Sequence, residues 1–190
     1  KAQSVDDIYA MLVASPSLNM LNTRYIIYNP DQAPIRNPYA FGNAWFVDKV
    51  EIVENADAEI DALNTINPLE TAVVDKRFAK DLEGFTPQKD STASIVLEKY
   101  RPSRLTYKTK AASDQLAVFS EVYYQPGWKA YVDGKEVPHF RVDWILRGMV
   151  VPAGEHTVVF EFYPDTYVLA ANVSAYSSFL ILLLLLAAIG

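Results

Sequence analysis

The chain has 190 residues, a formal net charge of −6 and no cysteine. This length allows one domain with at most a small appendage, and the absence of cysteine excludes a disulfide scaffold and any Cys-based metal site or nucleophile. The acidic balance argues against a nucleic-acid partner, which would need a basic surface stripe.

The first residues predict two short helices. Ser4 and Asp7 have the spacing of a capping box, and apolar residues follow at helical intervals. Ser15 and Pro16 mark a second helix start, with serine as the N-cap and proline at the first helical position.

A short helix and three strands are expected between the N-terminal helices and residue 75. Asn55 is expected to cap the helix, whose inner face is predicted to be Ile60 and Leu63. The expected strands are residues 25–28, 45–53 and 72–74. Residues 75–92 are polar and form the expected boundary between two halves of the chain.

From residue 94 onward the pattern predicts β-strands. Asp133-Gly134 is the strongest turn signal, because a type I′ hairpin needs positive φ at both central positions. Residues 116–124 are mostly apolar and are predicted to form a central strand. The predicted strand pairs are 94–100 with 105–110, 127–132 with 135–137, and 146–151 with 155–163. Short strands at this spacing are typical of a β-sandwich.

The end of the chain is strongly apolar. Residues 166–190 carry no charge, and Phe179 to Ile189 is an unbroken apolar run. A transmembrane helix needs about 20 apolar residues, so we expect one here, starting near Ala170 and truncated at its end. A buried core helix is the alternative, but five adjacent leucines leave no polar face for one. The expected interfacial aromatic residues are Tyr163, Tyr167 and Tyr176.

The entry side of this segment is poor in cations. The nearest one before it is Arg147, so the Lys/Arg cluster expected on a cytoplasmic flank is missing. This favours a domain that lies outside the cytoplasm, in the periplasm if the source is Gram-negative.

Two charged residues lie in apolar strands. Glu121 interrupts the central strand, and a buried carboxylate needs a cation or hydrogen-bond donors. Arg147, in a similarly apolar strand, is the natural partner. An ion pair, two separately solvated charges, a ligand-binding role and catalysis are the alternatives for these two residues.

Aromatic residues are concentrated in the second half of the chain. Aromatic planes bind sugars by stacking, while carboxylate and guanidinium groups hydrogen-bond to the sugar edges. The candidate ligand-binding residues are therefore Glu121, Tyr123, Tyr124, Trp128, Trp144 and Arg147. Core packing is the alternative, because Trp and Tyr are first of all core and interface residues.

Several catalytic signatures are absent. The sequence has no Gly-rich phosphate loop and no G-x-S-x-G elbow, and we predict no catalytic residue, no metal site and no cofactor. Its two histidines, His139 and His156, lie in different predicted elements, and His156 is expected to pack or hydrogen-bond at a strand start. These observations leave open whether the protein is an enzyme.

Together these features predict an α+β, mainly β chain. It comprises an N-terminal α/β subdomain at residues 1–92, an antiparallel β-sandwich subdomain at residues 93–165 and a truncated transmembrane helix at residues 166–190.

Six segments stand out together, in chain order Leu21–Ile27, Gly42–Val47, Phe119–Trp128, Asp133–Lys135, Leu146–Gly148 and Val151–His156. They resemble the C-terminal extracytoplasmic region of the bacterial YfhO family. The third is the most specific, and the resemblance spans about residues 18 to 180. Since the chain begins with Lys1, we expect it to be a piece of a longer protein.

The resemblance implies a parent with many membrane spans, whose membrane core is similar to GT-C glycosyltransferases that use polyprenyl-phosphate sugars. The expected partners are the membrane, the upstream transmembrane region of the same protein, and an envelope glycan or polyprenyl-linked sugar. The expected role is a non-catalytic domain that guides such a ligand. The alternatives are a purely structural domain packed on the membrane core and, more remotely, an independent glycoside hydrolase.

Overall fold

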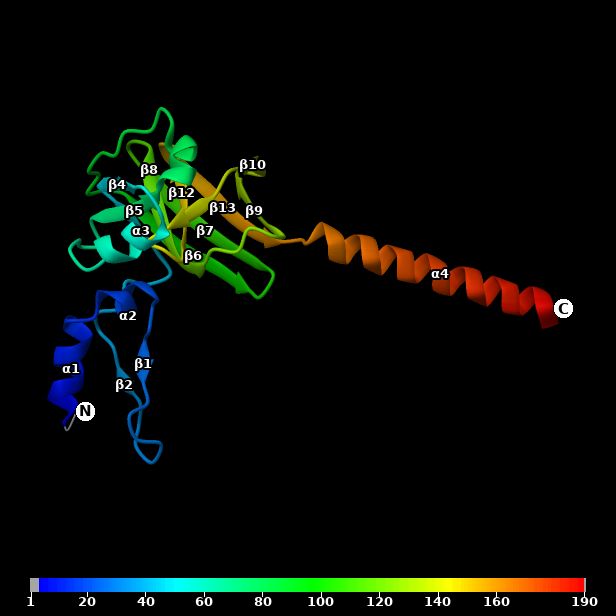
Figure 1. Ribbon diagram of the computed structural model, residues 1–190, viewed down its shortest axis with the longest axis horizontal. Coiled ribbons are helices and arrows are strands. Elements are labelled where there is room, and N and C mark those ends of the chain that lie inside the picture. Colours follow the sequence, from blue (N-terminus) through cyan, green and yellow to red (C-terminus); the bar gives the residue numbers. More distant parts are fainter. Residues whose placement is uncertain (1–3, 190) are drawn as a thin grey trace.

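The computed structural model describes residues 4–189. It shows a β-sandwich with a small N-terminal unit on one side and a long helix that projects away from the sandwich (Figure 1). The predicted α+β, mainly β fold class with a C-terminal apolar helix is confirmed.

The helices are α1 (Val5–Val13), α2 (Pro16–Met20), α3 (Ala56–Ala62), the 3₁₀ helix η1 (Lys76–Leu82) and α4 (Asp165–Ile189). The strands before residue 76 are β1 (Tyr25–Ile26), β2 (Ile35–Arg36), β3 (Ala44–Val47), β4 (Lys49–Val53) and β5 (Thr71–Asp75). The later strands are β6 (Ser94–Arg101), β7 (Arg104–Ala111), β8 (Gln115–Val122), β9 (Trp128–Val132), β10 (Lys135–Val137), β11 (Phe140–Val142), β12 (Leu146–Val151) and β13 (Gly154–Phe162).

Two antiparallel sheets form the sandwich. One has the strand order β10-β9-β13-β7-β6, and the other has the order β11-β12-β8-β3. Their facing side chains form an apolar core in which the Phe119 ring makes edge-to-face contacts with Tyr107 and Phe160, at centroid distances of 4.9 and 4.8 Å. Such contacts add to the stabilisation that the burial of aromatic area provides.

The four-stranded sheet is also covered on its outer face. Leu116 and Val118 of β8 pack there with Ala72 and Val74 of β5 and with Leu82 of η1. Strand β8 is therefore buried on both faces, which explains its continuous apolar run. The prediction of a central strand here is confirmed, since β8 lies between β12 and β3.

Two of the predicted hairpins are confirmed. Strands β6 and β7 pair, as do β9 and β10, and Asp133 and Gly134 have φ of 49° and 82°, as a type I′ turn requires. The third predicted pair is wrong: β12 pairs with β8 and β11, whereas β13 pairs with β7 and β9. The Pro152–Gly154 turn carries the chain from one sheet to the other.

Other expectations for the first half need correction. The single strand expected over residues 45–53 is split at Asp48, because β3 joins the sandwich and β4 pairs in parallel with β5. In α3 the residue that faces inward is Glu59, which is fully buried, whereas Ile60 is 39% exposed. Leu63 packs on the core as predicted.

The N-terminal unit follows the predicted local signals. Ser4 and Asp7 form the capping box of α1, and Pro16 occupies the start of α2. The unit has a small core of its own around Ile8, Leu12 and Ile35. The division of the chain near residue 92 stays a prediction, and β3 contributes a strand from the first half to the sandwich.

Helix α4 has the length and composition of a membrane span. Its segment Asp165–Ala188 has a mean hydropathy of 2.0 and is not buried against the rest of the described chain. It thus differs from a buried core helix. It begins five residues before the expected start near Ala170, directly after the last strand of the sandwich.

Candidate functional site at the end of the sandwich next to α4

The sandwich joins α4 with almost no linker. The Tyr163 N–H donates to the Gly127 carbonyl at 2.6 Å, and the Phe162 N–H donates to the Ser103 carbonyl at 2.8 Å. Gly127 has a φ of 90°, and a Cβ added there would lie 2.9 Å from the Cβ of Pro164. The backbone at Gly127, directly before β9, therefore packs on the residue that leads into the helix.

Arg147 is buried beside this junction. Its Cζ lies 4.1 Å from the centroid of the Trp128 ring and 5.3 Å from that of Phe160, and its Nε donates to the Val122 carbonyl at 3.0 Å. Among the described residues its Nη1 has no hydrogen-bond partner. Burial lowers the pKa of Arg147, opposed by the charge of Glu121. The cation is held mainly by aromatic faces.

Glu121 owes its position to an irregular strand pairing. Leu146 pairs with Val122 and Arg147 with Phe119, so Ser120 and Glu121 form a bulge in β8. The side chain is half-buried, and burial raises its pKa while the Arg147 charge opposes that shift. An ion pair between Glu121 and Arg147, one of the alternatives for these residues, is not formed within 4.0 Å among residues 4–189, since the aromatic rings, and not the carboxylate, flank the guanidinium.

The three other candidate residues differ in burial and in their contacts. Tyr123 is half-buried and makes edge contacts with Phe78 and His139, each at a centroid distance of 5.7 Å. Burial lowers the pKa of His139 to about 4, so that ring is neutral at neutral pH. Tyr124 and Trp144 are exposed by 54% and 42%. The structure thus brings together Glu121, Trp128 and Arg147, while ligand binding by any of the six stays a prediction.

A buried ionic network is hydrogen-bonded to the backbone of Trp144. Glu59 forms an ion pair with Arg141, which also lies 3.3 Å from Asp75, and the Trp144 N–H donates to Glu59 at 3.0 Å. Trp144 has a φ of 68°, a left-handed conformation that is unfavourable for a bulky residue. Burial raises the pKa of Glu59, opposed by the Trp144 N–H and by Arg141.

Asp143, which precedes Trp144 in the chain, is also buried. Its Oδ1 accepts a hydrogen bond from the Val73 N–H at 2.8 Å, and its own N–H donates to the Val73 carbonyl at 2.9 Å. Burial raises its pKa to about 7. These acidic residues are not among the candidates predicted from the sequence, because Glu59 and Arg141 are 82 positions apart. A helix whose apolar face contains a glutamate was the available signal.

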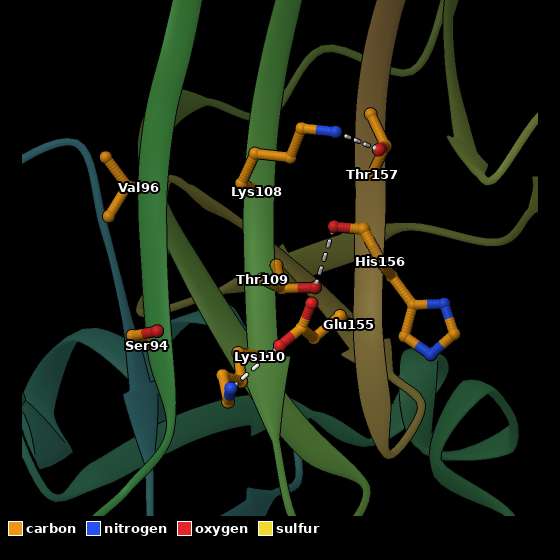
Figure 2. Close-up of a pocket in the computed structure, with 8 residues that line it drawn as sticks. All are labelled: Ser94, Val96, Lys108, Thr109, Lys110, Glu155, His156 and Thr157. Atoms are coloured by element: carbon orange, nitrogen blue, oxygen red, sulfur yellow. Dashed lines mark hydrogen bonds and ion pairs between the residues drawn. The ribbon is translucent and has the colours of Figure 1, made fainter.

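A polar groove runs over the outer face of the five-stranded sheet. It has a volume of about 490 Å³ and is lined by Ser94, Val96, Lys108, Thr109, Lys110, Glu155, His156 and Thr157. Figure 2 shows Lys108 directed at Thr157 and Lys110 at Glu155, at distances of 2.8 and 2.7 Å. Its lysines are thus already hydrogen-bonded within the sheet.

His156 faces away from the groove (Figure 2). Its Nδ1 lies 2.6 Å from Asp133, and its Nε2 lies 3.0 Å from the Ala153 carbonyl. The hydrogen bond to Asp133 raises the pKa of His156, because the protonated ring donates to both acceptors. His156 therefore links two turns by hydrogen bonds. Hydrogen bonding at a strand start was one of the roles expected for it.

The lining of the cavities bears on the glycoside hydrolase alternative. Glycoside hydrolysis needs two accessible carboxylates about 5 to 10 Å apart. Of the five cavities described, the groove of Figure 2 has one carboxylate, from Glu155, and the others have none. Within residues 4–189 there is also no group of three His, Asp or Glu side chains arranged to hold a metal ion.

Comparison with known proteins finds a match to a protein family. Residues 82–174 match the model of the family described as bacterial membrane protein YfhO. No curated protein and no solved structure matches the chain. The matched region contains the whole five-stranded sheet, strands β8, β11 and β12, and the first part of α4.

Proposed function

We propose that this chain, whose residues 82–174 match the model of the YfhO family of bacterial membrane proteins, is a non-catalytic extracytoplasmic domain anchored by α4. Its role is to hold a rigid β-sandwich at a defined position over the membrane core of its parent protein. The parent is proposed to resemble GT-C glycosyltransferases, which use polyprenyl-phosphate sugars.

The junction between the sandwich and α4 carries this proposal. Two backbone hydrogen bonds and the contact of Gly127 with Pro164 leave no flexible linker. The Trp128 ring, which a sugar would stack on, already contacts Arg147 and Phe162, with Cζ of Arg147 at 4.1 Å and the Phe162 ring centroid at 5.3 Å from the Trp128 ring centroid. Both observations favour a structural, positioning role for the cluster formed by Glu121, Trp128 and Arg147.

Labelling in the native membrane tests the orientation. The chain has no cysteine, so Lys135→Cys introduces one thiol at an exposed turn. In the intact gene product, a membrane-impermeant maleimide is expected to label this thiol in whole cells, with the unsubstituted protein as control. Labelling only after cell lysis would contradict an extracytoplasmic domain. Release of residues 1–190 from membranes by alkaline carbonate would contradict anchoring by α4.

Guidance of an envelope glycan or lipid-linked sugar is the second candidate. The exposed Trp144, held in an unfavourable conformation by Glu59, favours it, since backbone strain of this kind is concentrated at functional sites. Calorimetric titration of the chain with envelope glycans tests this role. If no glycan binds, and if Trp128→Ala and Trp144→Ala alter only stability, the guiding role is wrong.

A further inference from the structure

A row of charged residues crosses the end of the five-stranded sheet next to α4. Arg101 of β6 pairs with Arg104 of β7, Arg104 pairs with Glu161 of β13, and Glu161 pairs with Lys129 of β9. Neighbouring partners in a sheet point to the same face, so three cations and one carboxylate lie side by side. In a chain with a net charge of −6, this is a local excess of positive charge.

The one carboxylate in the row does not neutralise it. Glu161 lies 3.0 Å from Arg104, whereas Arg101 and Lys129 form no ion pair within the described part of the chain. Lys99, in the next outward position of β6, adds a fourth cation. Lys99, Arg101 and Arg104 line a concave surface of about 340 Å³. The charges at this edge are therefore available to an external anion.

This charged row lies where α4 begins. The carbonyl of Ser103, in the turn between Arg101 and Arg104, accepts the hydrogen bond from Phe162, three residues before Asp165. Figure 1 shows the β6–β7 turn on the side of the sandwich from which α4 leaves. Three exposed tyrosines lie close in sequence to the charged row and to the start of α4: Tyr100, Tyr163 and Tyr167, with exposures of 63%, 52% and 70%.

Both groups suit the surface of a lipid bilayer. Tyr side chains favour the interface, where the ring is apolar and the hydroxyl is hydrated. Basic residues close to an anionic leaflet are attracted to it within a Debye length. The row is continuous with the segment that has the properties of a span, and the complementary charge is that of phospholipid phosphate groups.

We propose that Lys99, Arg101, Arg104 and Lys129 dock the end of the sandwich on anionic phospholipid headgroups, with the three tyrosines at the interface. This inference rests on the proposed function, because it requires α4 to span the bilayer. It adds a second contact between the protein and the membrane, which would orient the sandwich relative to the surface.

Spin labelling in nanodiscs tests the docking. The full chain carries one nitroxide at Ser103→Cys, or at Ala153→Cys at the other end of β13 as the control. Discs contain phosphatidylcholine alone or phosphatidylcholine with phosphatidylglycerol. A water-soluble relaxation agent is expected to reach position 103 less in the anionic discs, and high salt is expected to restore access. Position 153 is expected to stay accessible in both.

Matched charge variants identify the residues. Arg101→Gln with Arg104→Gln is expected to lower the ratio of docked to undocked sandwich about thirtyfold on anionic discs. Lys108→Gln with Lys110→Gln removes the same charge farther from α4 and is expected to leave this ratio unchanged. Equal effects of the two pairs, or equal access to position 103 in both kinds of disc, would overturn the proposal. Protection of position 103 by inorganic phosphate in zwitterionic discs would assign the cations to a soluble anion and overturn it as well.

A separate label reports the anchor. A nitroxide at Ser178→Cys is expected to be accessible to oxygen dissolved in the lipid and not to the water-soluble agent. If this label stays in water, the proposed function fails. If it is in lipid while position 103 stays in water on anionic discs, the docking proposal alone fails.

Discussion

The guanidinium of Arg147 stacks on the ring of Trp128, with Cζ 4.1 Å from the ring centroid. The arginine is 3% exposed, so this contact and the hydrogen bond to Val122 replace most of its hydration. A desolvated cation–π contact of this kind contributes about 2 kcal/mol. The pair connects the four-stranded sheet to β9 of the other sheet, close to the start of α4.

Trp128→Ala is expected to lower the free energy of unfolding by about 3 kcal/mol, because it removes packed aromatic area and uncovers a buried cation. Urea denaturation of the chain measures this loss. Trp144→Ala is the control: that side chain is 42% exposed, so a loss below about 1 kcal/mol is expected. Equal losses for the two variants would show that Trp128 has no special structural role.

Glu59→Ala is expected to destabilise the fold by about 3 kcal/mol, because it leaves Arg141 without its main partner at a largely buried position. It also removes the acceptor for the Trp144 N–H, so the fluorescence of Trp144 is expected to report a more mobile turn. Asp61→Ala, at an exposed position of the same helix, is the control and is expected to change stability by less than about 0.5 kcal/mol.

Asp143 is expected to make the protein less stable as pH rises. Its folded-state pKa, about 7, lies above the value of 3.8 expected when it is exposed, so its contribution to stability is complete below about pH 4. That contribution is lost progressively as pH rises to 7, where the buried carboxyl ionises.

Asp143→Asn removes this titration. Asparagine keeps the acceptor for the Val73 N–H and tolerates the φ of 50°, so the variant is expected to be more stable than the parent at pH 8, on the order of 2 kcal/mol. Urea midpoints between pH 4 and 8 measure the difference. Parallel pH profiles for parent and variant would contradict the raised pKa.

Gly127→Ala is expected to loosen the connection to α4, because its Cβ would lie 2.9 Å from Pro164 and 3.0 Å from Phe162. Hydrogen exchange of the Phe162 and Tyr163 amides is expected to become faster, with a stability loss of about 2 kcal/mol. Gly134→Ala separates the clash from backbone strain: its φ of 82° is similar, but nothing lies within 4 Å of the added Cβ. If both variants speed exchange of these amides equally, packing at the junction is not the cause.

Local signals in the sequence were sufficient for several elements. The capping box of Ser4 and Asp7, the Asp133-Gly134 turn and the uncharged C-terminal segment each depend on neighbours along the chain. Propensity, turn geometry and the length of an apolar run are properties of such short segments, so these predictions hold without knowledge of the fold.

Contacts between distant segments decided the rest. Strand β12 pairs with β8 and not with β13, and Glu59 is buried because Arg141 comes to lie beside it; no periodicity encodes either contact. The basic row shows this best. The sequence has a net negative charge and a flank without cations before α4, yet the sheet register collects Arg101, Arg104 and Lys129 at that flank from three strands. Composition sums charge over the whole chain, whereas the field at a membrane surface depends on which side chains the tertiary structure places there.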